Sequence, residues 1–183
     1  IWKNMSLKII HTADWHLGQT FFGYDRDEEH EAFLSWLIDI LTLRQTDVLL
    51  IAGDVFDVAN PSAAAQRRFF RFLREANRHN PQLQIVIIAG NHDSAARLEA
   101  PIPLLEELNT SIVGVVPRTD LCKIDFDSLL IPLYNKEGKR EAICLAVPYL
   151  RQGDYPASKE GKDTYVEGVT RMYRQLYDYA DSQ

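Results

Sequence analysis

Short runs of aliphatic residues alternate with segments of helical periodicity in the first half of the chain. The runs are LKII at 7–10, DVLLIAG at 47–53 and QIVIIAG at 84–90. Each run is too short for a helix and rich in Ile, Val and Leu, which is typical of a strand buried on both faces of a sheet. Strand, helix, strand, helix and strand in this order predict a parallel sheet with right-handed crossovers.

The segments between these runs repeat their apolar residues at helical spacing. The inner face of the first helix, expected between Asp25 and Arg44, is formed by Phe33, Trp36, Leu37, Ile40 and Leu41. Three further apolar residues on this helix are Leu34, Ile38 and Leu43. They widen the apolar arc beyond the roughly 100° that covers one core face, which favours either a deep core or a contact between subunits. A second helix is expected near residues 62–79.

Beyond residue 110 the pattern changes to short extended segments separated by turn signals. The segments are SIVGVV at 111–116, CKIDF at 122–126, SLLIPLY at 128–134 and AICLAVPYL at 142–150. We expect them to be antiparallel strands of a second sheet. Helical spacing returns from about Thr164 to Ala180, and the polar stretch at 151–163 is expected to be a flexible loop.

Length and composition predict one domain in a reducing compartment. The chain has 183 residues, 46% of them hydrophobic, and a net charge of -6. Such a charge argues against coating nucleic acid by bulk electrostatics, so a phosphate-bearing partner would need a local patch or bound cations. Cys122 and Cys144 have no metal-like spacing, and they suit a cytoplasmic protein better than a disulfide framework. Residues 1–4 precede a natural-looking start at Met5 and are interpreted as upstream or non-native.

No run of 18 or more apolar residues occurs, and the N-terminus lacks a basic region followed by an apolar stretch. The sequence therefore indicates neither a membrane span nor export, and a cytoplasmic location is expected.

Polar side chains follow each of the three expected parallel strands. Asp14 and His16 come after the first, Asp54 and Asp57 after the second, and Asn91, His92 and Asp93 after the third. Because ligands collect outside the carboxyl ends of parallel strands, these groups are expected to converge. Asp14 and His16 lie two apart in what reads as an extended segment, so they are expected to point the same way.

The residue types at this edge indicate a divalent-metal site. Carboxylate, imidazole and amide oxygen form a set suited to manganese, iron or zinc, without a soft thiolate. A carboxylate such as Asp54 can bridge two ions, and ions roughly 3.5–4 Å apart stabilise the attacking and leaving oxygens of phosphoester hydrolysis. Gly53 and Gly90 would let the backbone turn sharply and approach a ligand.

Each signal also has a purely structural interpretation. A lone Asp-x-His is common, GD after a strand is usually a turn, and Asp93 or Ser94 could cap a helix. Asp57 and Asp93 are candidates for orienting a ligand. His11, His30 and His79 are interpreted as structural.

The motifs DWH, GDVFD and GNHD, in this order and spacing, resemble the first three motifs of the calcineurin-like metallophosphoesterase superfamily. HTADWHLGQ, AGDVFD and AGNHDS are similar to the bacterial SbcD family of nuclease subunits and its archaeal and eukaryotic recombination-nuclease relatives. The resemblance extends from about Leu7 to Leu150. It implies an α/β fold, an α/β/β/α sandwich in which two sheets lie between helices.

For the site, the resemblance implies that Asp14 and His16 bind one metal, Asp54 bridges, Asn91 binds a second metal, and His92 acts on the scissile phosphate or leaving group. It further implies a manganese-dependent DNA exonuclease or endonuclease with roles in DNA repair and recombination. Such a nuclease works as a homodimer with an SMC-like ATPase, SbcC.

The family completes its two-metal site with three later histidines in GH and GHxH motifs. This chain has five histidines, at 11, 16, 30, 79 and 92, and none after 92. We therefore expect a single, C-terminally truncated nuclease domain over 1–183, with a partial metal site and little activity alone. Alternatives are a phosphatase of the same superfamily, disfavoured because GDVFDVA lacks the arginine of GDxVDRG, and a non-catalytic module for dimerisation and ATPase docking.

A stripe of arginines lies along the second expected helix, at offsets of four, three and four. Its members are Arg67, Arg71, Arg74 and Arg78. The stripe is a candidate for DNA contact, although a solvated helix face is the stronger interpretation.

Overall fold

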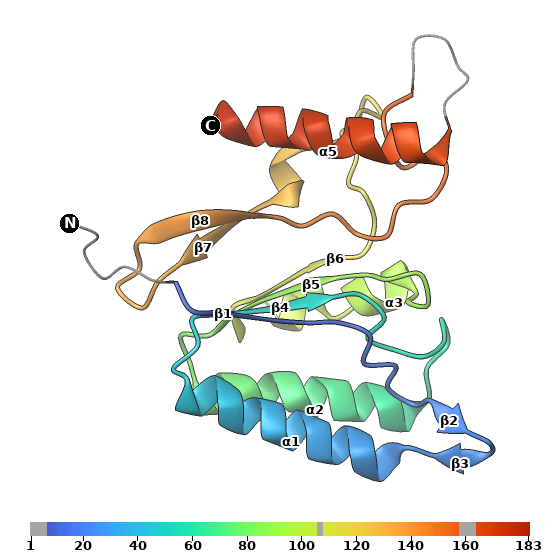
Figure 1. Cartoon of the computed structure of the whole chain (residues 1–183), viewed down its shortest axis with the longest axis vertical. Coiled ribbons are helices and arrows are strands. Elements are labelled where there is room, and N and C mark those ends of the chain that lie inside the picture. The colour runs from blue at the N-terminus through green and yellow to red at the C-terminus, as the bar shows by residue number, and fades with distance from the viewer. Residues whose placement is uncertain (1–6, 106–107, 158–163) are drawn as a thin grey trace.

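The computed structural model describes residues 7–105, 108–157 and 164–183. Figure 1 shows four layers: helices α1 and α2, a four-stranded sheet, the β7–β8 hairpin, and helix α5 on the outside. This arrangement confirms the expected α/β/β/α sandwich. The interpretation of residues 1–4 as non-native falls outside the described residues.

The main sheet is entirely parallel, in the order β1-β4-β5-β6. Its strands are β1 (Ile9–Thr12), β4 (Val48–Ala52), β5 (Gln84–Ile88) and β6 (Thr110–Val113). The first three confirm the strands predicted from the aliphatic runs. The expected burial on both faces holds for β4 and β5 but is wrong for β1, because β1 is an edge strand and Ile9 is exposed.

The antiparallel prediction for the segment at 111–116 is wrong. β6 pairs with β5 in parallel register, Ile85 with Thr110 and Ile88 with Val113. The short helices α3 (Ala95–Glu99) and α4 (Ile102–Leu105) lie in the connection between β5 and β6, and this connection brings the chain back so that β6 runs in the same direction as β5. A short aliphatic run carries no information about strand direction, which here depends on this crossover.

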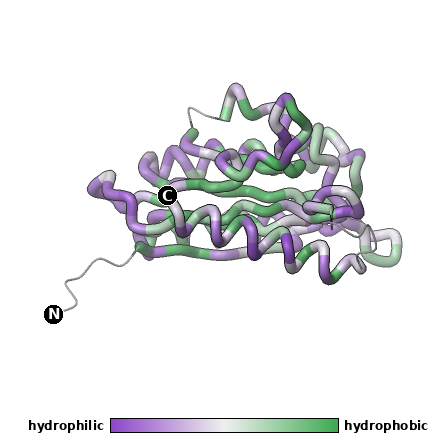
Figure 2. The backbone as a smooth tube through the Cα atoms, turned by 90° about the horizontal axis from the view of Figure 1, so that it is seen from above, coloured by the Kyte–Doolittle hydropathy of each residue, from purple (hydrophilic) through white to green (hydrophobic). Residues whose placement is uncertain are grey.

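Only part of the predicted second sheet forms as expected. β7 (Leu130–Tyr134) and β8 (Arg140–Leu145) pair in antiparallel fashion, which confirms two of the predicted segments. The segment at 122–126 is not a strand; within it, Ile124 makes a single bridge to Arg118. Figure 2 shows that the most hydrophobic stretches run through the middle of the molecule.

Alternation along the central strands builds two cores. In β5, Ile85 and Ile87 pack into the cluster that contains the inner faces of α1 and α2, whereas Val86 and Ile88 pack with β7, β8 and α5. Successive side chains of a strand point to opposite faces, so one strand anchors both layers. This double burial holds the carboxyl ends of β4 and β5 in place.

Helix α1 (Asp27–Leu43) is rotated from its predicted orientation. Its buried residues are His30, Leu34, Leu37 and Leu41. Trp36, expected on the inner face, is exposed, as is Leu43. Leu34 and Ile38 belong to the core or pack against it, which supports the deep-core interpretation for them and leaves Leu43 and Trp36 outward.

Helix α2 (Ala63–His79) begins at the Ser62 cap, whose hydroxyl accepts from Ala65 N–H at 3.1 Å. Helix α5 (Tyr165–Asp181) begins with a capping box between Thr164 and Glu167. Of the loop expected at 151–163, residues 158–163 lie outside the described residues. No helix in the described ranges has the length and apolar character needed to cross a membrane.

A small hairpin between β1 and α1 was not predicted. It consists of β2 (Thr20–Phe21) and β3 (Tyr24–Asp25). Strands of two residues give no periodic signal in a sequence. In Figure 1 the hairpin projects from the end of the molecule at which β1 and β4 finish.

Candidate metal-binding site

The loops that follow β1 and β4 run side by side and carry the first candidate ligands. Asp14 N–H donates to the Gly53 carbonyl at 3.1 Å, and His16 N–H donates to the Asp54 carbonyl at 2.9 Å. Asp14, His16 and Asp54 all have left-handed backbone conformations, with φ of 57°, 46° and 50°. The prediction of an extended segment is therefore wrong, because Asp14 and His16 lie in an irregular loop and have left-handed backbone conformations.

Buried and exposed side chains nevertheless alternate along this loop. Trp15 and Leu17 are buried in the core, while Asp14 is exposed and His16 is half-buried. Trp15 also donates from its indole N–H to the Thr12 hydroxyl at 2.9 Å. Burial of Trp15 and Leu17 thus anchors the loop and directs Asp14 and His16 toward the same region.

Two glycines allow the β4 and β5 loops to meet. Gly53 has φ of 89°, and a Cβ on it would lie 2.9 Å from the Cα of Gly90. A Cβ on Gly90 would overlap the carboxylate and the backbone nitrogen of Asp54. The expectation that these glycines permit a close backbone approach is confirmed, since neither loop has room for a side chain there.

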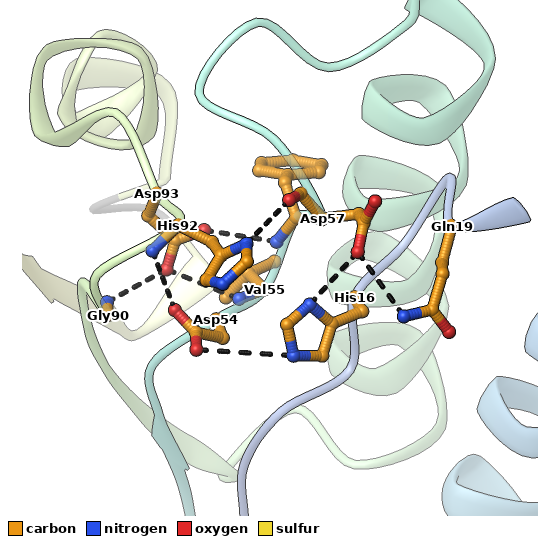
Figure 3. Close-up of polar contacts among 9 residues, drawn as sticks. His16, Gln19, Asp54, Val55, Asp57, Gly90, His92 and Asp93 are labelled. Carbon is orange, nitrogen blue, oxygen red and sulfur yellow. Dashed lines mark hydrogen bonds and ion pairs between the residues drawn. The ribbon is translucent and has the colours of Figure 1, made fainter.

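Asp14, His16 and Asp54 each offer a ligand atom, and these atoms all lie within 4.8 Å of one another. Figure 3 shows the His16 and Asp54 side chains pointing toward each other, with the His16 Nε2 4.0 Å from the Asp54 Oδ2. Atoms at such separations can share one cation, and two carboxylates with an imidazole suit a borderline divalent metal. These three residues therefore fit a divalent ion.

Asp57 lies on the other side of the His16 ring. Its Oδ1 is 3.2 Å from the His16 Nδ1, close enough for an ion pair but not aligned for a hydrogen bond. The same Oδ1 accepts from the Gln19 amide at 3.4 Å, and Gln19 in turn accepts from Arg26 at 2.8 Å. A carboxylate beside the distal nitrogen of a ligand histidine is the usual way to fix its ring orientation and tautomer.

His92 lies at the same edge, with its ring 4.9 Å from the His16 ring, centroid to centroid. Its backbone N–H donates to the Asp54 Oδ1 at 2.9 Å, and its Nδ1 lies 2.7 Å from the Asp57 carbonyl oxygen. The hydrogen bond to Asp57 and the nearby carboxylates raise the pKa of His92. The exposed Nε2 edge is therefore the part of the ring available to a ligand.

Asp93 is buried and ties the β4 and β5 loops together. Its carboxylate accepts three backbone N–H bonds, from Phe56 at 3.0 Å, Val55 at 3.2 Å and Gly90 at 2.9 Å. Of the two candidate caps, Ser94 occupies the N-cap position of α3 but makes no side-chain cap hydrogen bond, and Asp93 does not cap the helix. Asp93 instead fixes the loops that carry Asp54 and His92.

Asn91 lines a cavity of 350 Å³ together with Asp14 and Asp54. The opposite wall of this cavity is formed by Val147, Tyr149, Tyr165, Val169 and Tyr173. Sequence reasoning missed this wall, because its residues lie on or near the second sheet and α5 and carry no motif of their own. The Tyr149 N–H bond to the Ala89 carbonyl, 2.9 Å, holds the wall against the end of β5.

A second set of ligand atoms within 4.8 Å belongs to His16, Asp57 and His92. The two sets share His16, whose Nε2 side is near Asp54 and whose Nδ1 side is near Asp57. We favour the set with Asp14 and Asp54, because in it Asp57 remains available to orient His16.

Three of the four arginines of the α2 stripe contact acidic side chains. Arg71 contacts Glu31 of α1 at 2.6 Å, while Arg74 and Arg78 contact Glu75 at 3.0 and 2.7 Å. Arg67 is exposed and shares a surface depression with Arg71 and Arg74. These contacts accord with a solvated face, and DNA contact by the stripe stays a prediction.

The remaining histidines lie outside the site. His30 is buried on α1, His79 is exposed at the end of α2, and His11 is exposed on β1. The cysteines Cys122 and Cys144 are both free thiols.

Comparison with known proteins agrees with the motif resemblance. A model of the calcineurin-like phosphoesterase family matches residues 7–173. The SbcD subunit of nuclease SbcCD from Rhodobacter capsulatus is 48% identical over 171 residues, which cover 93% of this chain and 42% of that protein. The same subunit of Escherichia coli K12 is 33% identical over 180 residues, covering 93% and 41% of the two chains. That of Bacillus subtilis is 39% identical over 122 residues, covering 67% and 31%.

The chain thus spans about two fifths of the length of the first two relatives. The division of the sequence into one incomplete domain stays a prediction.

Proposed function

The chain belongs to the calcineurin-like phosphoesterase family, and on this basis we propose that it is part of the nuclease subunit of an SbcCD-type complex. Its reaction is the metal-dependent hydrolysis of DNA phosphodiester bonds. The similarity to the SbcD subunits of three bacteria supports this assignment. The observation that carries it is the grouping of Asp14, His16 and Asp54 at the carboxyl ends of β1 and β4.

We assign two divalent ions to the complete site. Its oxygen and nitrogen donors suit manganese, iron or zinc, and we take manganese from the resemblance to the SbcD family. Asp14, His16 and Asp54 would hold the first, and Asp54 and Asn91 would contribute to the second. Such ions activate water and neutralise the charge that develops on a phosphodiester. The cavity shared by Asp14, Asp54 and Asn91 supports this assignment.

The other residues of the site have separate roles in the proposal. Asp57 lies beside the His16 Nδ1 and would orient the ring so that its Nε2 faces a bound ion. His92 is held by its Nδ1 contact to the Asp57 carbonyl, so that its Nε2–H can approach a phosphate oxygen or the leaving group.

A phosphatase of the same family is the nearest alternative. Val58 and Ala59 follow Asp57 in GDVFDVA, where GDxVDRG would supply an arginine for a phosphate monoester. The loop therefore lacks the charge that a doubly ionised monoester would need, and this supports a diester substrate.

A scaffold role is the alternative from another class. Trp36 and Leu43 are exposed on α1, and such apolar residues are the kind that a subunit contact covers.

In our proposal this face of α1 belongs to a homodimer. An SMC-like ATPase (SbcC) and DNA are the further partners, and the cytoplasm is the location. These assignments rest on the similarity to SbcCD subunits.

The test compares the complete protein on duplex DNA, a phosphopeptide and a cyclic nucleotide with manganese present. We expect turnover of DNA only, abolished by Asp54→Asn and unchanged by Asp39→Asn, an exposed carboxylate on α1. His92→Ala should lower the rate by roughly 10²–10⁴ while metal binding persists. Preferential turnover of the phosphopeptide would replace the nuclease assignment with the phosphatase.

A scaffold is distinguished by a different pair of measurements. Absence of manganese binding by calorimetry, together with a stable dimer in analytical ultracentrifugation, would support a non-catalytic module.

A further inference from the structure

The β2–β3 hairpin carries three exposed aromatic side chains. Phe21 is 63% exposed, Phe22 88% and Tyr24 79%. Phe21 and Tyr24 are a directly opposed cross-strand pair, so their side chains lie on one face of the hairpin. The Phe22 ring lies edge-on to the Phe21 ring, with centroids 4.7 Å apart. Together these three side chains form an aromatic tip that buries little surface within the described chain.

The backbone conformation of the hairpin turn is unfavourable for Phe22. Phe22 and Gly23 both have positive φ, 49° and 84°, in a two-residue hairpin turn. Turns of this kind favour Asn, Asp or Gly at the first position, and a bulky residue there is a conformational outlier. Since the Phe22 ring is exposed, burial does not offset this cost. A strained, exposed aromatic residue indicates a role in binding.

The hairpin is attached directly to the candidate metal site. The Gln19 N–H donates to the His16 carbonyl at 3.0 Å, and Gln19 also contacts the Asp57 carboxylate. Thr20 begins β2 only four residues after His16, so the chain separates them by at most about 14 Å. Figure 1 shows the hairpin at the same end of the molecule as the ends of β1 and β4. Phe22, at the tip, is six residues from His16 and so lies within about 22 Å of it, a distance that a bound DNA strand of several nucleotides spans.

Charge near the hairpin does not favour contact with a phosphate backbone. The first turn of α1 is acidic, and two of its carboxylates are engaged within the chain, Asp27 with Arg68 at 2.8 Å and Glu29 with Arg26 at 3.9 Å. Aromatic faces, in contrast, bind any nucleobase whose own face is open, and this interaction does not depend on charge. Three such side chains supply roughly 450–750 Å², less than the ~800 Å² per partner of a standard protein interface.

We propose that the β2–β3 hairpin stacks on unpaired nucleobases beside the cleaved phosphodiester, with Phe22 and Phe21 as the stacking residues. This inference rests on the proposed nuclease function and adds a preference for single-stranded or frayed DNA. Bases inside a duplex are covered on both faces, so the aromatic tip can engage them only at ends or unpaired positions.

The test measures binding without turnover. The fluorescence anisotropy of a labelled oligothymidylate and of an abasic strand of equal length is followed in the presence of a chelator. The chain should bind the oligothymidylate at least about fivefold more tightly than the abasic strand. Phe22→Ala should weaken binding to the oligothymidylate by about fivefold or more and leave binding to the abasic strand unchanged.

Two further variants separate binding from folding. Phe22→Asn places a residue suited to the turn, so it should preserve or raise thermal stability while it weakens binding. Phe22→Trp should retain binding. Tyr177→Ala is the matched control, because Tyr177 on α5 is as exposed as Phe21, at 63%, and should not affect binding.

The inference is overturned if Phe22→Asn binds the oligothymidylate like the wild type, or if both strands bind equally well. It is also overturned if the variants change the oligomeric state and not the affinity for DNA. Failure of the nuclease assignment would appear separately, as undiminished DNA cleavage by Asp54→Asn or as cleavage of other substrates.

Discussion

Gly90 lies so close to Asp54 that a Cβ on Gly90 would overlap the Asp54 carboxylate. The two residues come from the ends of adjacent parallel strands, β4 and β5, and the missing side chain lets these ends approach. Asp54 is thereby positioned through backbone packing as well as through its hydrogen bond from His92 N–H.

Gly90→Ala should displace the Asp54 carboxylate and weaken manganese binding by about tenfold or more, as loss of ligand orientation does. Isothermal titration calorimetry measures this affinity. Gly138→Ala is the control: Gly138 has positive φ, but no atom of the described residues would lie within 4 Å of a Cβ placed there, so the change introduces backbone strain far from the site. Equal affinities for Gly90→Ala and wild type would show that this contact does not position Asp54.

Substitution of Asp57 tests whether this residue orients the His16 ring. Asp57→Ala should lower manganese affinity by about 10–100-fold with unchanged stoichiometry, because the His16 ring loses the partner of its Nδ1 while its Nε2 remains. Asp39→Asn should have no effect. Loss of one equivalent of bound metal in Asp57→Ala would instead identify Asp57 as a ligand.

The buried carboxylate of Asp93 should matter for stability. Asp93→Asn leaves one acceptor oxygen for three backbone N–H groups and turns an amide N–H toward donors. We expect a loss of roughly 1.5–3 kcal/mol in the free energy of unfolding, measured by urea denaturation. A midpoint within error of the wild type would mean that these hydrogen bonds are not needed to join the loops.

His30 makes the stability of the chain sensitive to pH. Burial, together with the nearby Arg26 and Arg68, lowers the pKa of His30, and its Nδ1 has no hydrogen-bond partner among the described residues. The unfolded chain therefore takes up a proton near the ordinary histidine pKa of about 6.5, at a pH where folded His30 is still neutral. Above that pH, His30 is neutral in both states and does not lower the free energy of unfolding. As pH falls from there toward the pKa of folded His30, the free energy of unfolding decreases by up to about 1.4 kcal/mol per pH unit.

The measurement is urea unfolding between pH 8 and pH 5.5. His30→Gln should show a flatter pH dependence than the wild type, whereas His79→Gln, at an exposed position on α2, should match the wild type. Parallel profiles for His30→Gln and the wild type would exclude His30 as the source.

Much of this architecture could be predicted from the sequence, because the central strands are encoded by uninterrupted aliphatic runs. β4 and β5 were found in this way, and the polar residues after them meet as expected. The buried face of α1 was not predicted correctly. Apolar residues nearly surround this helix, so periodicity could not distinguish the buried face with Leu34 from the exposed face with Trp36.

Other features depend on contacts between distant segments. The direction of β6 follows from its crossover, and the tyrosine wall of the cavity follows from the position of the N-terminal half of α5 beside the ends of β4 and β5. The left-handed backbone conformations of Asp14 and His16 accompany pairing of their loop with the loop after β4. Such features arise in the tertiary structure and leave no local pattern in the sequence.

The most direct test of the proposed metal site is a titration of the 183-residue chain with manganese. Binding is monitored by calorimetry and by the electron paramagnetic resonance signal of the free ion. We predict one binding event that Asp14→Asn, His16→Gln and Asp54→Asn each abolish or weaken by at least about tenfold, and that Asp39→Asn leaves intact. Manganese binding that is unchanged in all three site variants would contradict the assignment of these residues as a metal site.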